Sequence, residues 1–318
     1  MVETSTSGAS GRRTLSIVVP VYGNEGSLAA LFEELRRIES ELARRGLDLE
    51  LIFVDDGSRD GSMAVLRGLK AERPATRLIK LTRNFGAIHA ARTGLRFVTG
   101  DCFLFLAADL QDPPGLVLEM AERWLQGSKY ILCVRKERSD SVLSKLFSAL
   151  FYQLVRLTVV HDYPHGGYDL ALMDRAFLPY LLDSAKNVNT PLFSYWLGFK
   201  PDILEYVRQK RRHGKSKWTF SKRFKFFLDS LLGFSIVPVR AMSLFGALTS
   251  LGSFGYGTVI AVNALRGVRS VPGFATIVVV TSFLFGVVIM MLGVIGEYLW
   301  RIYDEVSRKP DAVIDEVD

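Results

Sequence analysis

Short apolar runs alternate with segments of helical periodicity over the first third of the chain. The apolar runs are rich in Val, Ile, Leu and Phe and predict buried strands. These strands are predicted at residues 15–21, 50–54, 77–81 and 101–107. Between them, apolar residues recur with the period of a helix, which predicts helices at residues 27–47, 60–70 and 88–97. Strands and helices that alternate in this way indicate an α/β fold, in which a mostly parallel sheet carries helices on its faces.

Two long apolar segments follow near the carboxyl end, at residues 241–265 and 274–295, and neither contains a charged residue. Each is longer than the ~20 residues that a helix needs to cross a bilayer. They predict two transmembrane helices, at about 241–265 and 274–297. The link between them is short and contains Pro272 and Gly273, so the two helices are expected to form a hairpin with both ends on one side.

The distribution of basic residues predicts on which side of the membrane both ends of this hairpin lie. Residues 208–225 contain nine Lys or Arg and no acid, whereas the link contains only Arg266 and Arg269. The positive-inside rule therefore predicts that both termini and the large amino-terminal domain lie in the cytoplasm. The net charge of +7 is concentrated beside the apolar segments, so anionic lipid is the expected partner rather than nucleic acid. No signal peptide opens the chain, and its two cysteines fit a reducing compartment.

These patterns divide the chain into five parts. Two amphipathic stretches, at residues 142–158 and 220–234, could each lie at the membrane interface or pack in an ordinary core. The predicted parts are a disordered tail at 1–13, an α/β domain at 14–219, an amphipathic juxtamembrane helix at 220–235, the two membrane helices within 236–303, and a cytoplasmic tail at 304–318.

The strongest candidate for chemistry is the stretch 100–114, where an apolar run enters Asp109-Leu110-Gln111-Asp112 and two prolines end it. Oxygen ligands at the end of a buried strand suit a hard cation such as Mg²⁺ or Mn²⁺, which could hold a diphosphate. The alternative is a simple turn after a strand. The ends of two other predicted strands, at Pro20 and Asp55, fall at the same sheet edge, where such sheets bind ligands.

Other residues at this edge have both a structural and a functional explanation. Tyr22 could stack on a flat base or pack in the core, and Glu25 could bind a ligand or occupy the first turn of a helix. No GxGxxG follows the first strand and no GxxxxGK[ST] occurs, which counts against a dinucleotide-binding dehydrogenase and a P-loop enzyme.

Four motifs, in this order and spacing, resemble family 2 glycosyltransferases of the GT-A (Rossmann-like) fold. The motifs are VVPVYGNE at 18–25, FVDDGS at 53–58, LTRNFG at 81–86 and ADLQDPP at 108–114. The second half is similar to polyprenyl-phosphate glycosyltransferases, which are related to dolichol-phosphate mannose synthase. The segments that carry this narrower resemblance are GGYDLALMDR at 166–175, YWLGF at 195–199, GKSKW at 214–218 and IGEYLWRIYDEV at 295–306.

The resemblance implies roles for individual residues. Asp109 and Gln111 match metal-binding positions, and Asp109 and Asp169 match catalytic acids, although the role of Asp169 is open. Arg135 and Lys145 match positions that bind the acceptor phosphate. The expected donor-binding residues are Pro20, Tyr22, Glu25, Phe53, Asp55 and Lys217.

The resemblance also implies a reaction: an inverting transfer of a sugar from a nucleotide diphosphate, favoured as UDP, to polyprenyl (undecaprenyl) phosphate. It would take place on the cytoplasmic face of a bacterial inner membrane, with Mg²⁺ or Mn²⁺ as cofactor and with the protein assembled as a homo-oligomer. A phosphate monoester is already ionised at neutral pH, so it can attack without a general base. The four histidines can therefore all be structural.

The chain departs from the family pattern at three places. Ala107 replaces the first acid of the metal motif, Ala171 replaces an expected arginine, and Gly23 is an extra residue. Two other functions are therefore kept open: a processive polysaccharide synthase, and a degenerate membrane protein that binds sugar nucleotides. The first usually has more membrane helices and a Gln-x-x-Arg-Trp motif, whereas residues 153–157 lack the tryptophan.

Overall fold

The computed structural model describes residues 12–136, 149, 152–164, 166–186, 188–207, 233–234, 237–266 and 273–318. The chain divides into two compact units. The first, here called the catalytic unit, consists of Met1–Phe226 and Pro310–Asp318, and the second, here called the helical unit, is Phe227–Lys309. The chain therefore leaves the first unit, builds the second and returns to the first.

One mixed eight-stranded sheet forms the centre of the catalytic unit, in the order β7-β5-β6-β4-β1-β2-β3-β8. Only β6 and β8 run against the other strands. The strands are β1 (Arg13–Val21), β2 (Leu47–Asp55), β3 (Arg77–Leu81), β4 (Cys102–Phe105), β5 (Tyr130–Arg135), β6 (Leu170–Asp174), β7 (Asp202–Tyr206) and β8 (Ile314–Val317). The predicted α/β architecture with a mostly parallel sheet is confirmed.

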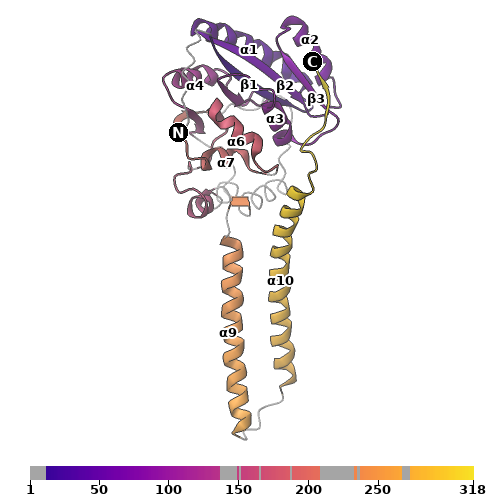
Figure 1. Cartoon of the computed structure of the whole chain (residues 1–318), viewed down its shortest axis with the longest axis vertical. Helices are drawn as coiled ribbons and strands as arrows, with labels where there is room; N and C mark the ends of the chain where they lie inside the picture. The colour runs from indigo at the N-terminus through magenta and orange to yellow at the C-terminus, as the bar shows by residue number, and fades with distance from the viewer. Residues whose placement is uncertain are drawn as a thin grey trace, which may run out of the picture. The chain divides into compact units, whose positions relative to one another are not determined.

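Helices cover both faces of this sheet (Figure 1). The apolar residues of α1, α2 and α4 pack with one set of strand side chains in a continuous core, while α3 packs on β1 and β2 from the other face and contacts α6. The helices are α1 (Glu25–Arg44), α2 (Ser62–Glu72), α3 (Ala87–Leu95), α4 (Leu116–Leu125), η1 (Arg175–Phe177), α6 (Leu178–Asp183) and α7 (Thr190–Trp196). The four strands and three helices predicted from the first third of the sequence are all present, with ends shifted by a few residues.

The last strand, β8, was not expected from the sequence. It lies antiparallel to β3 at the edge of the sheet and pairs Ile79 with Val317. Backbone hydrogen bonds join Leu78 and Asp318 in both directions, at 3.0 and 2.9 Å. The carboxyl end of the chain is therefore part of the catalytic unit's sheet.

The helical unit contains two long helices, α9 (Val237–Leu265) and α10 (Phe274–Val306) (Figure 1). Within the described residues, one helix, Thr276–Val306, is long and apolar enough to cross a membrane, and few of its residues are buried. The two-helix transmembrane hairpin stays a prediction. Most of the predicted juxtamembrane helix at 220–235 lies outside the described residues.

Candidate active site at the carboxyl edge of the sheet

The candidate residues meet at one edge of the sheet because of strand direction. The register places the end of β1 beside the end of β2, with Val21 opposite Asp55. β4 ends beside β1, and the chain then enters the Asp109 loop. β5 and β7 run parallel to these strands and end at Arg135 and Tyr206, which lie opposite one another. The shared edge that the sequence predicted for Pro20, Asp55 and Asp109 is thus confirmed.

Two adjacent carboxylates at the end of β2 differ in their bonding, although each residue is only 1% exposed. Asp56 accepts hydrogen bonds from the backbone N–H groups of Phe85 and Gly86, at 2.7 and 2.9 Å. Burial raises the pKa of Asp56, while these two bonds oppose the rise. Asp55 accepts one bond through Oδ2, from the Ser58 N–H at 3.2 Å.

The second oxygen of Asp55, Oδ1, is buried and has no hydrogen-bond partner within the described part of the chain. A buried carboxylate oxygen without a partner is costly, so native proteins rarely keep one without a functional reason. A ligand hydroxyl or N–H group at this edge would satisfy it.

The loop after β4 has a strained centre. Leu110 has a φ of 55°, a left-handed conformation that is rare for a residue with a branched side chain. It is also buried, so packing holds the strained backbone in place. The neighbouring Asp109 Oδ1 accepts the N–H of Gln111 at 3.3 Å. Strain of this kind is concentrated at ligand sites, where a fixed geometry matters more than its cost of about 1–3 kcal/mol.

Four side chains form a connected polar cluster at the ends of β5 and β7. Arg135 binds Asp169 with two N–H groups, through Nε to Oδ2 and through Nη2 to Oδ1 at 2.5 Å. The Tyr206 hydroxyl lies 2.7 Å from Asp112 Oδ1 and 3.0 Å from Asp169 Oδ2. Burial disfavours the charge of Arg135, but the hydrogen bond and charge of Asp169 outweigh it and raise the pKa of the guanidinium.

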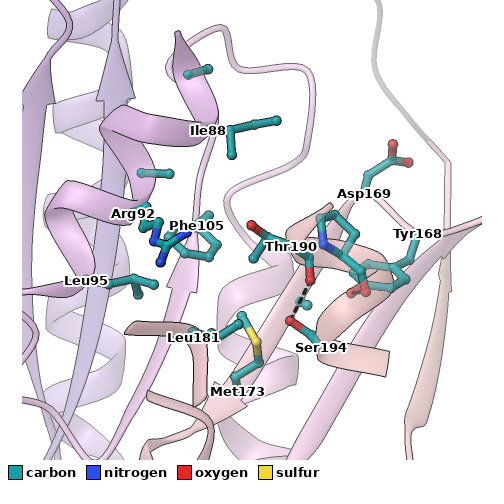
Figure 2. A pocket seen from close by; sticks show the side chains of 14 residues that line it. Ile88, Arg92, Leu95, Phe105, Tyr168, Asp169, Met173, Leu181, Thr190 and Ser194 are labelled. Atoms are coloured by element: carbon teal, nitrogen blue, oxygen red, sulfur yellow. Dashed lines mark hydrogen bonds between the residues drawn. The ribbon is translucent and has the colours of Figure 1, made fainter. Parts of the chain in front are cut away.

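A cavity of about 210 Å³ opens beside Asp169, on the sheet face that α3 covers. In Figure 2, Ile88, Arg92 and Leu95 line one side, and Tyr168 and Asp169 lie on the opposite side. Most of the lining is apolar, including Phe105 and Ala171. The volume is below the range of roughly 300–1,000 Å³ for sites that hold drug-sized ligands, so the cavity suits a group of about one ring.

The other predicted donor residues lie near the edge but make protein contacts. Glu25 Oε2 accepts the N–H of Gly61 at 2.9 Å, Pro20 is half-buried at the end of β1, and the Tyr22 N–H donates to Asn24 Oδ1 at 3.0 Å. The side chain of Phe53 is fully buried in the core. Lys145 and Lys217 lie outside the described residues.

The sequence predicts no role at this site for Asp56, Asp112 or Tyr206, although Asp56 lies in the motif FVDDGS. Asp112 belongs to the acidic cluster after β4, so its position was a usable signal. Tyr206 ends a short strand of ordinary composition, and only the fold brings it next to Asp112, which is 94 residues away.

The donor set at the loop fits a divalent cation that is shared with a substrate. Asp109 and Gln111 offer one carboxylate and one amide oxygen, and the described residues contain no cluster of three or more His, Cys, Asp or Glu that could hold a metal alone. Mg²⁺ commonly binds through one or two carboxylates together with substrate phosphates. Asp109 and Gln111 could therefore hold such an ion together with substrate phosphates.

Known proteins resemble the chain over most of its length. An uncharacterized glycosyltransferase of Bacillus subtilis, YkcC, is 34% identical and covers 93% of this chain and 91% of its own. The SfII prophage-derived bactoprenol glucosyl transferase of Shigella flexneri is 30% identical over 94% of this chain and 97% of its own. Among solved structures, the mannosyltransferase PcManGT of Pyrobaculum calidifontis, in complex with GDP-Man and Mn²⁺, is 17% identical, with a TM-score of 0.43, and covers 89% of this chain and 88% of its own.

Fold and site together define an α/β protein with helices on both faces of its sheet and a ligand site at the carboxyl ends of the strands. The chain belongs to glycosyl transferase family 2, whose family model matches residues 16–179, more than half of its length. It is therefore a glycosyltransferase.

Proposed function

We propose that this enzyme transfers a sugar from a nucleotide diphosphate, favoured as a UDP-sugar, to undecaprenyl phosphate, with inversion at the anomeric carbon. The observation that carries the proposal is that candidate donor and acceptor groups share one sheet edge. The Asp55 oxygen that has no partner among the described residues lies at the end of β2, and the Arg135–Asp169 pair lies at the end of β5. The names of the bactoprenol glucosyl transferase relatives support a polyprenyl acceptor.

In this proposal the ends of β1 and β2 bind the nucleoside. Asp55 Oδ1 accepts a hydrogen bond from a ribose hydroxyl or a base N–H. This bond gives the oxygen the partner that it lacks among the described residues. Pro20 and Tyr22 form a wall beside it, Glu25 and Phe53 support the two strand ends, and Lys217 neutralises donor phosphate charge. The sugar is then directed toward the cavity beside Asp169.

Arg135 holds the acceptor phosphate, together with Lys145. Asp169 engages two N–H groups of the guanidinium, and a guanidinium has five, so further N–H groups can reach a phosphate oxygen. Arg135 is thereby fixed in direction before the substrate arrives. A preset donor loses less conformational entropy on binding than a mobile surface arginine.

The reaction forms one bond and breaks one. An ionised oxygen of the acceptor phosphate attacks the anomeric carbon, and the bond from that carbon to the β-phosphate oxygen breaks. The electron pair leaves with the nucleoside diphosphate, so no proton transfer is required. Mg²⁺ or Mn²⁺ at Asp109 and Gln111 would supply charge neutralisation for the leaving diphosphate. The protein's own contribution is to hold the two phosphate groups in line.

We also propose that α9 and α10 are membrane helices, with the catalytic unit in the cytoplasm. The pairing of β8 with β3 supports the hairpin. Since the segments on both sides of Phe227–Lys309 belong to one compact unit, the segment between them can cross a bilayer only an even number of times. The basic residues of 208–225 favour the cytoplasmic side. We propose, finally, that the protein assembles as a homo-oligomer through these helices.

The test is turnover of purified full-length enzyme with radiolabelled nucleotide sugars, undecaprenyl phosphate and Mn²⁺. We expect a lipid-linked monosaccharide, and we expect Asp109→Ala to lower its formation roughly hundredfold or more, because the diphosphate loses its carboxylate partner. Asp48→Ala is the matched control, since Asp48 is an exposed carboxylate at the opposite end of β2, and it should retain full activity.

Other outcomes would contradict the proposal. A polymer as the product would indicate a processive synthase, and donor binding without turnover for every sugar tested would indicate a degenerate binding protein. Near-normal metal-dependent turnover by Asp109→Ala would show that the site assignment is wrong.

A further inference from the structure

Tyr206 connects two parts of the site that are far apart in the sequence. Its hydroxyl lies 2.7 Å from Oδ1 of Asp112, in the loop that also carries Asp109 and Gln111. It lies 3.0 Å from Oδ2 of Asp169, which precedes β6 and binds Arg135. Within the described residues, this single hydroxyl bridges the proposed metal–diphosphate loop and the proposed acceptor-phosphate pair.

The backbone around Tyr206 fixes the position of this hydroxyl. Tyr206 ends β7 directly opposite Arg135 in the parallel register with β5, and its carbonyl accepts the N–H of Lys136 at 2.9 Å. The N–H of Asp169 donates to the carbonyl of Cys133 on β5, at 3.2 Å. Backbone hydrogen bonds to β5 thus fix both Tyr206 and Asp169. The Tyr206 side chain then contacts the loop after β4 through Asp112.

The environment keeps the phenol protonated and therefore a donor. Tyr206 and Asp112 are each only 6% exposed. Burial raises the pKa of Tyr206, and the negative charges of Asp169 and Asp112 raise it further. A phenol has only one proton to donate to these two carboxylates. A movement of either carboxylate therefore changes the hydrogen bond between Tyr206 and the other one.

A purely structural explanation would be that Tyr206 satisfies the buried carboxylate of Asp112. That explanation accounts for the shorter contact but not for the second one, to Asp169, an exposed acid that lines the cavity. It also leaves unexplained why the strained loop centred on Leu110 is tied to the pair that would hold the acceptor.

We propose that Tyr206 is a positioning residue for glycosyl transfer, which holds the carboxylate of Asp169 at a fixed distance from the loop that carries Asp109 and Gln111. This inference rests on the proposed function, because it assumes that the donor diphosphate and the acceptor phosphate occupy these two places. Its role is to keep the two substrates aligned, since in-line transfer between two held groups is sensitive to small displacements.

The test compares Tyr206→Phe with Tyr195→Phe in the full-length enzyme. Tyr195 is a matched control, because it is a similarly buried tyrosine, 8% exposed, whose hydroxyl bonds the backbone carbonyl of Asp162 at 2.6 Å. We expect Tyr206→Phe to lower kcat about tenfold while the donor KM changes less than about threefold. The control should keep kcat, and the two variants should have similar melting temperatures.

A double-mutant cycle adds a second measurement. The cycle compares the single variants Asp112→Asn and Tyr206→Phe with the double variant. If Tyr206 acts through Asp112, the fold-loss of kcat in the double variant should be clearly smaller than the product of the two single fold-losses. Unchanged kcat in Tyr206→Phe, or a loss of kcat that accompanies an equal loss of folded protein in both tyrosine variants, would overturn the proposal.

Failure of the proposed function gives a different result. If the wild-type enzyme makes no product with undecaprenyl phosphate, the acceptor assignment is wrong. The same variants are then compared by donor hydrolysis, with water as the acceptor. A selective loss in Tyr206→Phe would still support the positioning role, and equal rates in both tyrosine variants would refute it.

Discussion

At the scale of single residues, two neighbouring carboxylates, those of Asp55 and Asp56, have different roles at this site. Asp55 and Asp56 are adjacent and equally buried. Asp56 is bonded to Phe85 and Gly86 and so fixes the loop after β3. Asp55 keeps one buried oxygen without a partner within the described residues. The difference lies in the direction of each side chain, and it separates a structural carboxylate from one that can bind a ligand.

Isosteric substitutions should separate these two roles. Asp55→Asn is expected to weaken donor binding by roughly ten- to hundredfold, because a hydrogen bond to a charged group contributes about 1.5–3 kcal/mol. Its melting temperature should hardly change, since the lost charge has little bonding within the folded protein. Equilibrium binding of nucleotide sugars and thermal unfolding in detergent measure the two effects.

Asp56→Asn is the matched comparison. Its amide NH₂ would face one of the backbone N–H groups that Asp56 now accepts, so we expect a loss of about 1–3 kcal/mol in stability. Equal losses of donor affinity and of stability in the two variants would contradict the division of roles.

At the scale of elements, β8 supports the site from the edge of the sheet. The Thr82 N–H, just after β3, donates to the carbonyl of Val313 at 3.0 Å. Asp311 forms an ion pair with Arg92 of α3 at 3.3 Å, and both side chains are largely buried. Arg92 also donates to backbone carbonyls at the end of α6, among them that of Ala185 at 2.6 Å, and it lines the cavity.

Removal of residues 310–318 should therefore affect both stability and the donor site. It leaves Arg92 without the charge of Asp311, and breaking a buried pair costs about 3–5 kcal/mol. We expect a lower melting temperature and a higher donor KM, because the loop after β3 loses its support.

Glu316→Ala is the control for this truncation, because it removes only the exposed ion pair with Arg67. Such pairs contribute about 0–1 kcal/mol, so this variant should resemble the wild type. A truncated enzyme with an unchanged melting temperature and donor KM would show that β8 has no supporting role.

How well the sequence predicts an element or contact depends on how far apart in the sequence the interacting residues are. The strands and helices up to β4 follow from local periodicity, and the shared edge follows from parallel strand order. By contrast, the Arg135–Asp169 pair joins residues 34 positions apart, and it forms only because β6 runs between β4 and β5. No local pattern marks β8, since its pairing with β3 depends on a return of the chain to the sheet.

At the scale of the whole molecule, the chain interrupts one compact unit with another. The apolar helix Thr276–Val306 belongs to the inserted unit, and β8 follows it. If the inserted unit spans a membrane, as proposed above, this order restricts its topology, because the segments on both sides of the insertion belong to one compact unit.

Single cysteines can test this topology, because Cys102 and Cys133 are both buried. In intact cells, a membrane-impermeant thiol reagent should label Ser270→Cys, in the link between the two helices, and should not label Asp318→Cys. After lysis it should label both. Labelling of Asp318→Cys in intact cells, or protection of Ser270→Cys, would rule out the proposed hairpin with cytoplasmic ends.

The long separation between β3 and β8 along the chain also sets the order of events during synthesis. β3 leaves the ribosome with its outer edge unpaired, and its partner around Val317 follows only roughly 10 to 50 seconds later, at about 5–20 residues per second. An open strand edge can pair with other chains during that time. The sheet therefore closes at this edge only after β8 has been made, and by then both long helices have already been synthesised. Completion of the sheet thereby depends on a segment that follows the apolar helices in the chain.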